Sequence, residues 1–130
     1  MNWIAPERLD NTLLARAARI RLAVFDVDGV LTDGSLHYGA AGEEVKVFNT
    51  LDGHGLKMLK DSGVELAIIS GRSSEALARR ARDLQITQLF MGVPDKLRVF
   101  EHLLHSLSLQ GPDVAGIGDD VVDLPYLTRC

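Results

Sequence analysis

Short runs of consecutive apolar residues alternate along the chain with stretches in which apolar residues recur at helical spacing. A strand covered on both faces is apolar throughout, whereas a helix with one buried face has apolar residues every three or four positions. The apolar runs predict four strands, at residues 20–28, 64–69, 88–91 and 114–117. The stretches of helical period predict helices at residues 6–19, 56–62, 73–84 and 96–109.

The order of these elements predicts an α/β fold. Strands that alternate with helices form a parallel sheet with right-handed crossovers. We therefore predict a three-layer, Rossmann-like arrangement in one domain that comprises residues 1–130. The polar, glycine-rich segment 50–55 is predicted to be a link that leads into the second helix.

A different pattern separates the first strand from this link. Residues 35–38 form a possible short strand, residues 39–42 supply turn residues, and residues 44–48 alternate between polar and apolar. This pattern predicts a β-hairpin outside the main sheet. An isolated hairpin is only marginally stable in water. We therefore expect the segment 33–49 to pack on the domain or on another copy of itself, which is a first indication of oligomerisation.

Composition narrows the class of protein. The chain has 130 residues and a formal net charge of −4, which argues against nucleic acid or an anionic membrane as partner. Cys130 is the only cysteine, so no internal disulfide is expected. No apolar run has the roughly 18 residues of a membrane span, and the first ten residues lack the apolar core of a signal peptide. We expect a cytoplasmic protein with no membrane partner.

The polar residues with chemical potential follow the predicted strands. Asp26 and Asp28 are two positions apart, so their side chains lie on the same face of an extended segment, and Gly29 then allows a turn. Ligands of parallel α/β sheets bind beyond the carboxyl ends of the strands. We therefore expect one site at this edge, formed by Asp26, Asp28, Ser70, Gly71, Arg72, Lys96, Asp119 and Asp120.

These residue types favour the chemistry of phosphate esters. Asp26, Asp28 and either Asp119 or Asp120 offer the oxygen ligands that Mg²⁺ prefers. Ser70 and the amide of Gly71 can hold phosphate oxygens at a helix N-terminus, and Lys96 adds a positive charge. No serine or cysteine is paired with a histidine, so an aspartate is the candidate nucleophile, and an acid two residues later can transfer protons.

Four segments in this order resemble the motifs of the haloacid dehalogenase (HAD) superfamily: FDVDGVLTDG, IISGR, the lysine of PDKLRVF, and IGDDVVDLP. Three longer segments, DGVLTDG, GEEVKVFNTLDGHGLKMLKDSG and IISGRSSEALARRARDL, resemble the 3-deoxy-D-manno-octulosonate 8-phosphate phosphatase family. The resemblance covers about residues 20–127. It implies a HAD-type phosphatase without a cap domain that requires Mg²⁺ and acts in bacterial lipopolysaccharide sugar synthesis.

The resemblance also assigns roles to single residues. It implies that Asp26 is the nucleophile and that Asp28 is the general acid/base, which also gives its backbone carbonyl to the metal. Asp119 is implied as a further metal ligand, with Asp120 and Asp123 behind it. The remaining assignments are Thr32 to support of the first loop, Ser70 and Gly71 to phosphate, Lys96 to nucleophile and phosphate, and Arg72, Asn49 and Asp52 to the sugar acid.

The family further implies a homotetramer in which hairpins pair around a centre and a neighbouring subunit helps to close each site. Its chains normally continue for about one strand and one helix beyond the last motif, whereas this sequence ends at Cys130. We therefore expect either a fragment or a shortened protein, with an open edge beside the fourth strand.

Three further functions remain open. The substrate could be a related nonulosonate 9-phosphate, since enzymes without a cap take specificity from neighbouring subunits. A receiver-type signalling domain also gathers acids and a lysine on a parallel sheet, although the inserted hairpin and Thr32 argue against it. The chain could also be an inactive assembly module that keeps the hairpin interface.

Overall fold

A computed structural model of the chain describes residues 6–130, and its account of side chains leaves out Pro6, Glu43 and Glu44. Residues 1–5, which the predicted domain includes, lie outside the described residues. The main sheet has four parallel strands in the order β5-β4-β1-β6. They are β1 (Leu22–Phe25), β4 (Glu65–Ile69), β5 (Gln88–Phe90) and β6 (Val114–Ile117). The predicted parallel α/β fold is confirmed.

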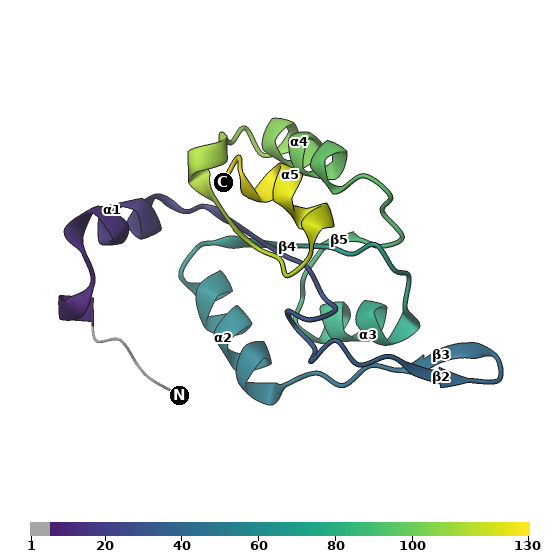
Figure 1. Ribbon diagram of the computed structural model, residues 1–130. Coiled ribbons are helices and arrows are strands. Elements are labelled where there is room, and N and C mark those ends of the chain that lie inside the picture. Colours follow the sequence, from purple (N-terminus) through teal and green to yellow (C-terminus); the bar gives the residue numbers. More distant parts are fainter. Residues whose placement is uncertain (1–5) are drawn as a thin grey trace.

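Helices cover both faces of this sheet (Figure 1). One core contains Phe25 and Ile68 and is closed by α2 (Thr50–Asp61) and α3 (Glu75–Asp83). The other contains Val24 and Ile69 and is closed by α4 (Lys96–Ser106) and α5 (Leu124–Leu127). All four residues of β1 are buried, as expected for a central strand with a helical layer on each side. No helix in residues 6–130 is both long and apolar enough to cross a membrane.

The predicted hairpin is confirmed. It consists of β2 (His37–Gly39) and β3 (Gly42–Val45), which pair antiparallel and project from the body of the protein (Figure 1). Within residues 6–130 no separate cap domain accompanies it. The predicted open edge is also present in the described sheet, where β6 pairs with β1 on one side only.

Two predicted helix boundaries are wrong. The first predicted helix is interrupted, because Asp10 is extended and separates a 3-10 turn, η1 (Pro6–Arg8), from α1 (Asn11–Arg19). The segment 50–55 is not a link but the first half of α2, whose N-terminus is capped by the side chain of Asn49. Gly53 lies within this helix, and a β-carbon at its position would overlap the guanidinium of Arg80. Close packing, rather than a turn, accounts for that glycine.

The remaining boundaries agree with the prediction to within a few residues. Ser74 caps α3 by accepting a hydrogen bond from the Leu77 amide. α4 ends at Ser106, slightly earlier than predicted, and the chain then passes through Ser108 in the left-handed region at φ 54°. Two further 3-10 turns, η2 (Gly111–Asp113) and η3 (Val121–Asp123), flank β6.

Candidate active site

The carboxyl ends of the parallel strands surround a hollow of about 300 Å³. Its lining includes Asp26, Asp28, Gly71, Arg72, Lys96, Asp119 and Asp120. These residues come from the loops after β1, β4 and β6 and from the start of α4. The sequence therefore predicted correctly that they share one edge of the sheet.

Lys96 lies between two buried carboxylates. Its Nζ is 2.8 Å from Asp26 Oδ1 and 2.6 Å from Asp123 Oδ1. Burial alone would lower the pKa of Lys96, but the hydrogen bonds that it donates to Asp123 and Asp26 raise its pKa above the ordinary value. Burial raises the pKa of Asp26, and the hydrogen bond from Lys96 offsets part of this rise. Lys96 therefore stays positively charged and offsets the negative charge of the Asp26 and Asp123 carboxylates.

A third carboxylate completes the group. Ligand oxygens of Asp26, Asp119 and Asp123 all lie within 4.8 Å of one another. The chain reaches this geometry because Gly29, at φ +86°, has no side chain, and a β-carbon there would overlap the Asp119 carboxylate. Asp26 and Asp119 offer hard oxygen ligands of the kind that Mg²⁺ prefers, while Asp123, the third member of the group, accepts a hydrogen bond from Lys96. Three carboxylates beside one lysine carry a net negative charge, so a bound cation would reduce the repulsion among the carboxylates.

Asp123 has a more central place than the sequence indicated. It is fully buried, and its second oxygen, Oδ2, accepts hydrogen bonds from the Asp119 and Asp120 amides at 3.2 Å each. A β-carbon at Gly118 would overlap it. Asp123 therefore fixes the loop that presents Asp119. The carboxylate of Asp28 is not a member of the acidic group, and its predicted metal contact through the backbone carbonyl stays a prediction.

The turn after β4 starts from a buried serine and is ordered by its own hydrogen bonds. Ser70 is 1% exposed, and its Oγ accepts from the Arg72 amide at 3.2 Å. Thr32 organises the first loop in the same way, since its Oγ1 accepts from the amides of Gly29 and Gly34. This agrees with the supporting role that the resemblance implies for Thr32.

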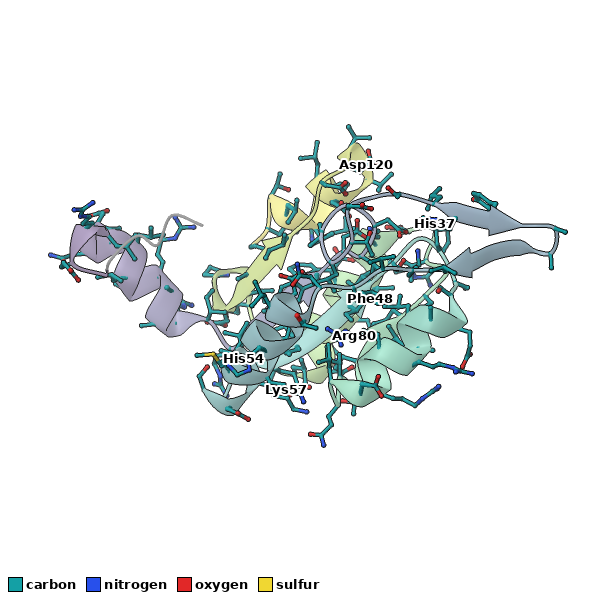
Figure 2. All side chains as sticks on the ribbon, turned by 90° about the horizontal axis from the view of Figure 1, so that it is seen from below. His37, Phe48, His54, Lys57, Arg80 and Asp120 are labelled. Atoms are coloured by element: carbon teal, nitrogen blue, oxygen red, sulfur yellow. The ribbon has the colours of Figure 1, made fainter. Side chains whose placement is uncertain are left out.

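Asn49 and Asp52 lie beside the acidic site rather than in it. Together with Thr32 they line a neighbouring hollow of about 330 Å³. Asn49 is also held by its surroundings: its side chain caps α2, and its carbonyl accepts from Arg80 at 3.0 Å. Figure 2 shows Arg80 close to Phe48, whereas His54 and Lys57 lie on α2 far from Asp120.

Sequence reasoning missed Lys46. Its Nζ donates to Asp28 Oδ1 at 2.5 Å, although alternation around β3 ordinarily turns apolar residues inward. Here the pattern is reversed, because Val45 and Val47 are 50% and 63% exposed while Lys46 is buried. The sequence shows a lysine between two valines in an alternating segment. That pattern alone does not indicate which face of the hairpin packs on the domain.

No protein-family model matches the chain. Among curated proteins it is 45% identical over 117 residues to the 3-deoxy-D-manno-octulosonate 8-phosphate phosphatase KdsC of Yersinia pestis, a match that covers 90% of this chain and 63% of that protein. The chain thus spans less than two thirds of the length of this relative.

Solved structures agree with this similarity. The cobalt-bound deoxy-D-mannose-octulosonate 8-phosphate phosphatase of Haemophilus influenzae is 43% identical, with a TM-score of 0.85 over 88% of this chain and 67% of that one. The enzyme of Moraxella catarrhalis, solved with magnesium ion, phosphate ion and KDO, is 44% identical, with a TM-score of 0.83 over 88% of this chain and 66% of that one.

Proposed function

Because the chain belongs to the 3-deoxy-D-manno-octulosonate 8-phosphate phosphatase family of the HAD superfamily, we propose that it is a Mg²⁺-dependent phosphatase for 3-deoxy-D-manno-octulosonate 8-phosphate. The observation that carries the proposal is the buried arrangement of Asp26, Lys96 and Asp123 with Asp119 at the mouth of the hollow. A nucleophile, a fixed cation and a set of metal ligands thereby meet at one sheet edge.

The proposed mechanism assigns the attack to Asp26. Its carboxylate oxygen forms a bond to phosphorus, the bond from phosphorus to the sugar oxygen breaks, and Asp28 gives that oxygen a proton. A water oxygen then forms a bond to the phosphorus of the aspartyl-phosphate while the water gives a proton to Asp28, and the bond from phosphorus to the Asp26 oxygen breaks, which releases phosphate and restores the Asp26 carboxylate. Lys96 holds Asp26 in place through the 2.8 Å contact. Asp26, Asp119 and the backbone of Asp28 would hold Mg²⁺, which supplies charge stabilisation for the transferred group.

The two ends of the substrate have separate candidates. We assign the phosphoryl group to Ser70 and Gly71, which form the turn before α3, with Thr32 ordering the loop opposite. Arg72, which lines the acidic hollow, is assigned to the sugar acid. Asn49 and Asp52 are assigned to the same end of the substrate from the neighbouring hollow.

The proposal includes a setting and an assembly. A phosphatase of this substrate belongs to lipopolysaccharide sugar synthesis in the cytoplasm, and the absence of internal disulfides expected from a single cysteine is consistent with that compartment. We assign self-association as a homotetramer to the hairpin segment 33–49. Its support is a group of exposed apolar side chains on this one segment: Leu36, Tyr38, Val45 and Val47.

The test is a panel of phosphorylated keto sugar acids assayed with Mg²⁺ and again with EDTA. We expect release of phosphate from the octulosonate 8-phosphate, loss of activity with EDTA, and loss by roughly 10⁴-fold in Asp26→Asn with an unchanged circular dichroism spectrum. Preference for a nonulosonate 9-phosphate would move the assignment to that substrate. Absence of turnover with every ester, by a folded and Mg²⁺-binding chain, would favour the assembly module instead.

A further inference from the structure

The hairpin places a buried lysine against the catalytic edge. Lys46 follows β3 directly, its side chain is 1% exposed, and its Nζ lies 2.5 Å from Asp28 Oδ1. A buried ammonium group loses several kcal/mol of hydration, so it requires a close and well-oriented partner. The contact is therefore a fixed part of the folded hairpin, unlike a solvated surface ion pair.

The two buried lysines serve different carboxylates. Lys96, from α4, contacts Asp26 and Asp123, whereas Lys46, from the hairpin, contacts Asp28. The side chain of Asp28 is 23% exposed, so it stands at the mouth of the hollow, where a leaving oxygen and a water can reach it.

Arg72 reinforces the dependence of Asp28 on the hairpin. Its Nε lies 3.9 Å from the other oxygen of Asp28, Oδ2. Its terminal nitrogen donates to the Tyr38 hydroxyl at 2.7 Å, and its guanidinium lies 5.9 Å from the centre of that ring. Both oxygens of Asp28 thus face cations, of which one belongs to the hairpin and the other is held by it.

We propose that Lys46 is a positioning residue that holds the Asp28 carboxylate in the orientation needed for both proton transfers. The inference rests on the proposed function and deepens it. Lys46 does not touch the substrate; it acts through Asp28, and it makes the hairpin a working part of the site. A displacement of about 1 Å at a reacting group can reduce a rate on the order of 100-fold, so one fixed contact of this kind has a measurable effect.

The test uses leaving groups that differ in their need for a proton. A sugar alkoxide must be protonated as its bond to phosphorus breaks, whereas p-nitrophenolate is a stable anion and leaves without a proton. In Lys46→Met we expect single-turnover phosphoenzyme formation to slow on the order of 10- to 100-fold with the sugar phosphate and less than about threefold with p-nitrophenyl phosphate. Since hydrolysis of the phosphoenzyme also needs Asp28, p-nitrophenyl phosphate should give a burst of product followed by slow turnover.

Three variants separate positioning from a structural effect. Lys57→Met makes the same change at an exposed lysine of α2 and should leave both rates unchanged. Lys46→Arg keeps the charge and should recover part of the lost rate. In an Asp28→Asn background, Lys46→Met should have little further effect on either rate, because a residue that acts through Asp28 has nothing left to position.

Equal slowing with both substrates, or an undiminished effect of Lys46→Met in the Asp28→Asn background, overturns the inference and leaves the proposed function standing. Wild-type rates in Lys46→Met overturn it as well. If the wild-type chain hydrolyses neither ester with Mg²⁺, the proposed function fails, and the inference fails with it.

Discussion

At the scale of single residues, the chain offsets several acids at one sheet edge with two buried lysines. Of the two lysines, Lys96 has the more deeply buried partners, since it lies between Asp26, 7% exposed, and Asp123, fully buried. Removal of one partner from a buried charge pair is costly because the other charge stays behind without compensation. The stability of the fold and the position of Asp26, the proposed nucleophile, therefore depend on the same ammonium group.

We expect Lys96→Met to lower the free energy of unfolding by about 3–5 kcal/mol at pH 7 without Mg²⁺. The pKa of Lys96 is raised in the folded chain, so its contribution is fully present below its ordinary pKa and is lost only as the pH rises through the folded value. The deficit should thus be equal at pH 7 and pH 9. Urea unfolding measures it, with Lys57→Met as the control. A deficit below about 1 kcal/mol would contradict the arrangement.

Gly29 links the first loop to the metal site. Gly29→Ala introduces strain at φ +86° and places a β-carbon on the Asp119 carboxylate. Gly63→Ala is a matched control, because Gly63 has φ +94° but nothing within 4 Å of a β-carbon. Both variants should lose about 1 kcal/mol of stability. Only Gly29→Ala should need more Mg²⁺ for half-maximal activity, by at least about tenfold, the scale of a displaced metal ligand. Equal Mg²⁺ requirements would refute the role of this glycine.

The acidic edge could be predicted because it depends on elements whose patterns are local. Continuous apolar runs identified β1, β4 and β6. Because ligands of parallel sheets bind beyond the carboxyl ends of the strands, the polar residues after these strands could be assigned to one site. Asp123 and Lys46 were not assigned their contacts, because these depend on how loops fold back. A lysine in an alternating segment and an aspartate in a 3-10 turn have no preferred partner until the tertiary structure supplies one.

At the scale of elements, the segment that leads from β3 to α2 packs against α3. Arg80 lies over the Phe48 ring at 5.7 Å, donates to the Asn49 carbonyl and packs against Gly53 of α2. One side chain thereby connects the hairpin, the start of α2 and α3 (Figure 2). This contact also helps to explain why the helical start at Thr50 escaped prediction: two glycines in the segment indicated a loop, and Arg80, against which Gly53 packs, lies far away in sequence.

Arg80→Met should therefore loosen this junction. We expect a loss of about 1–2 kcal/mol in the free energy of unfolding, from one charged hydrogen bond and one cation–π contact. Amide hydrogen exchange should accelerate around residues 49–53. Arg79→Met is the control: Arg79 is exposed and forms an ion pair with Glu75 on the same helix, so its loss should cost less than about 0.5 kcal/mol. Similar costs for the two variants would count against the junction.

At the scale of the whole molecule, exposed apolar surface is unevenly distributed. Part of it lies along β6, where Ile117 is 48% exposed and a hollow of about 580 Å³ separates the strand from α1. α1 itself has no buried residue and is joined to η2 by the Arg19–Asp113 ion pair. A second part lies on the hairpin, whose valines face outward because Lys46 and Phe48 occupy the inner register.

The hairpin valines provide the test of assembly. Val47 is 63% exposed, so Val47→Glu should leave the fold of one subunit unchanged, but it would place a charge in a hairpin-to-hairpin contact, where burial without a partner costs several kcal/mol. We expect the wild-type chain to sediment as a tetramer at micromolar concentration and Val47→Glu to sediment as smaller species. Met58→Glu, at a side chain of α2 that is 60% exposed, is the matched control and should not change the mass. If Val47→Glu sediments like the wild type, or Met58→Glu disrupts the assembly instead, the contact lies elsewhere on the molecule. Val47 is a suitable position for this test because the inward side chain of Lys46 turns its neighbour Val47 toward the outside of the hairpin.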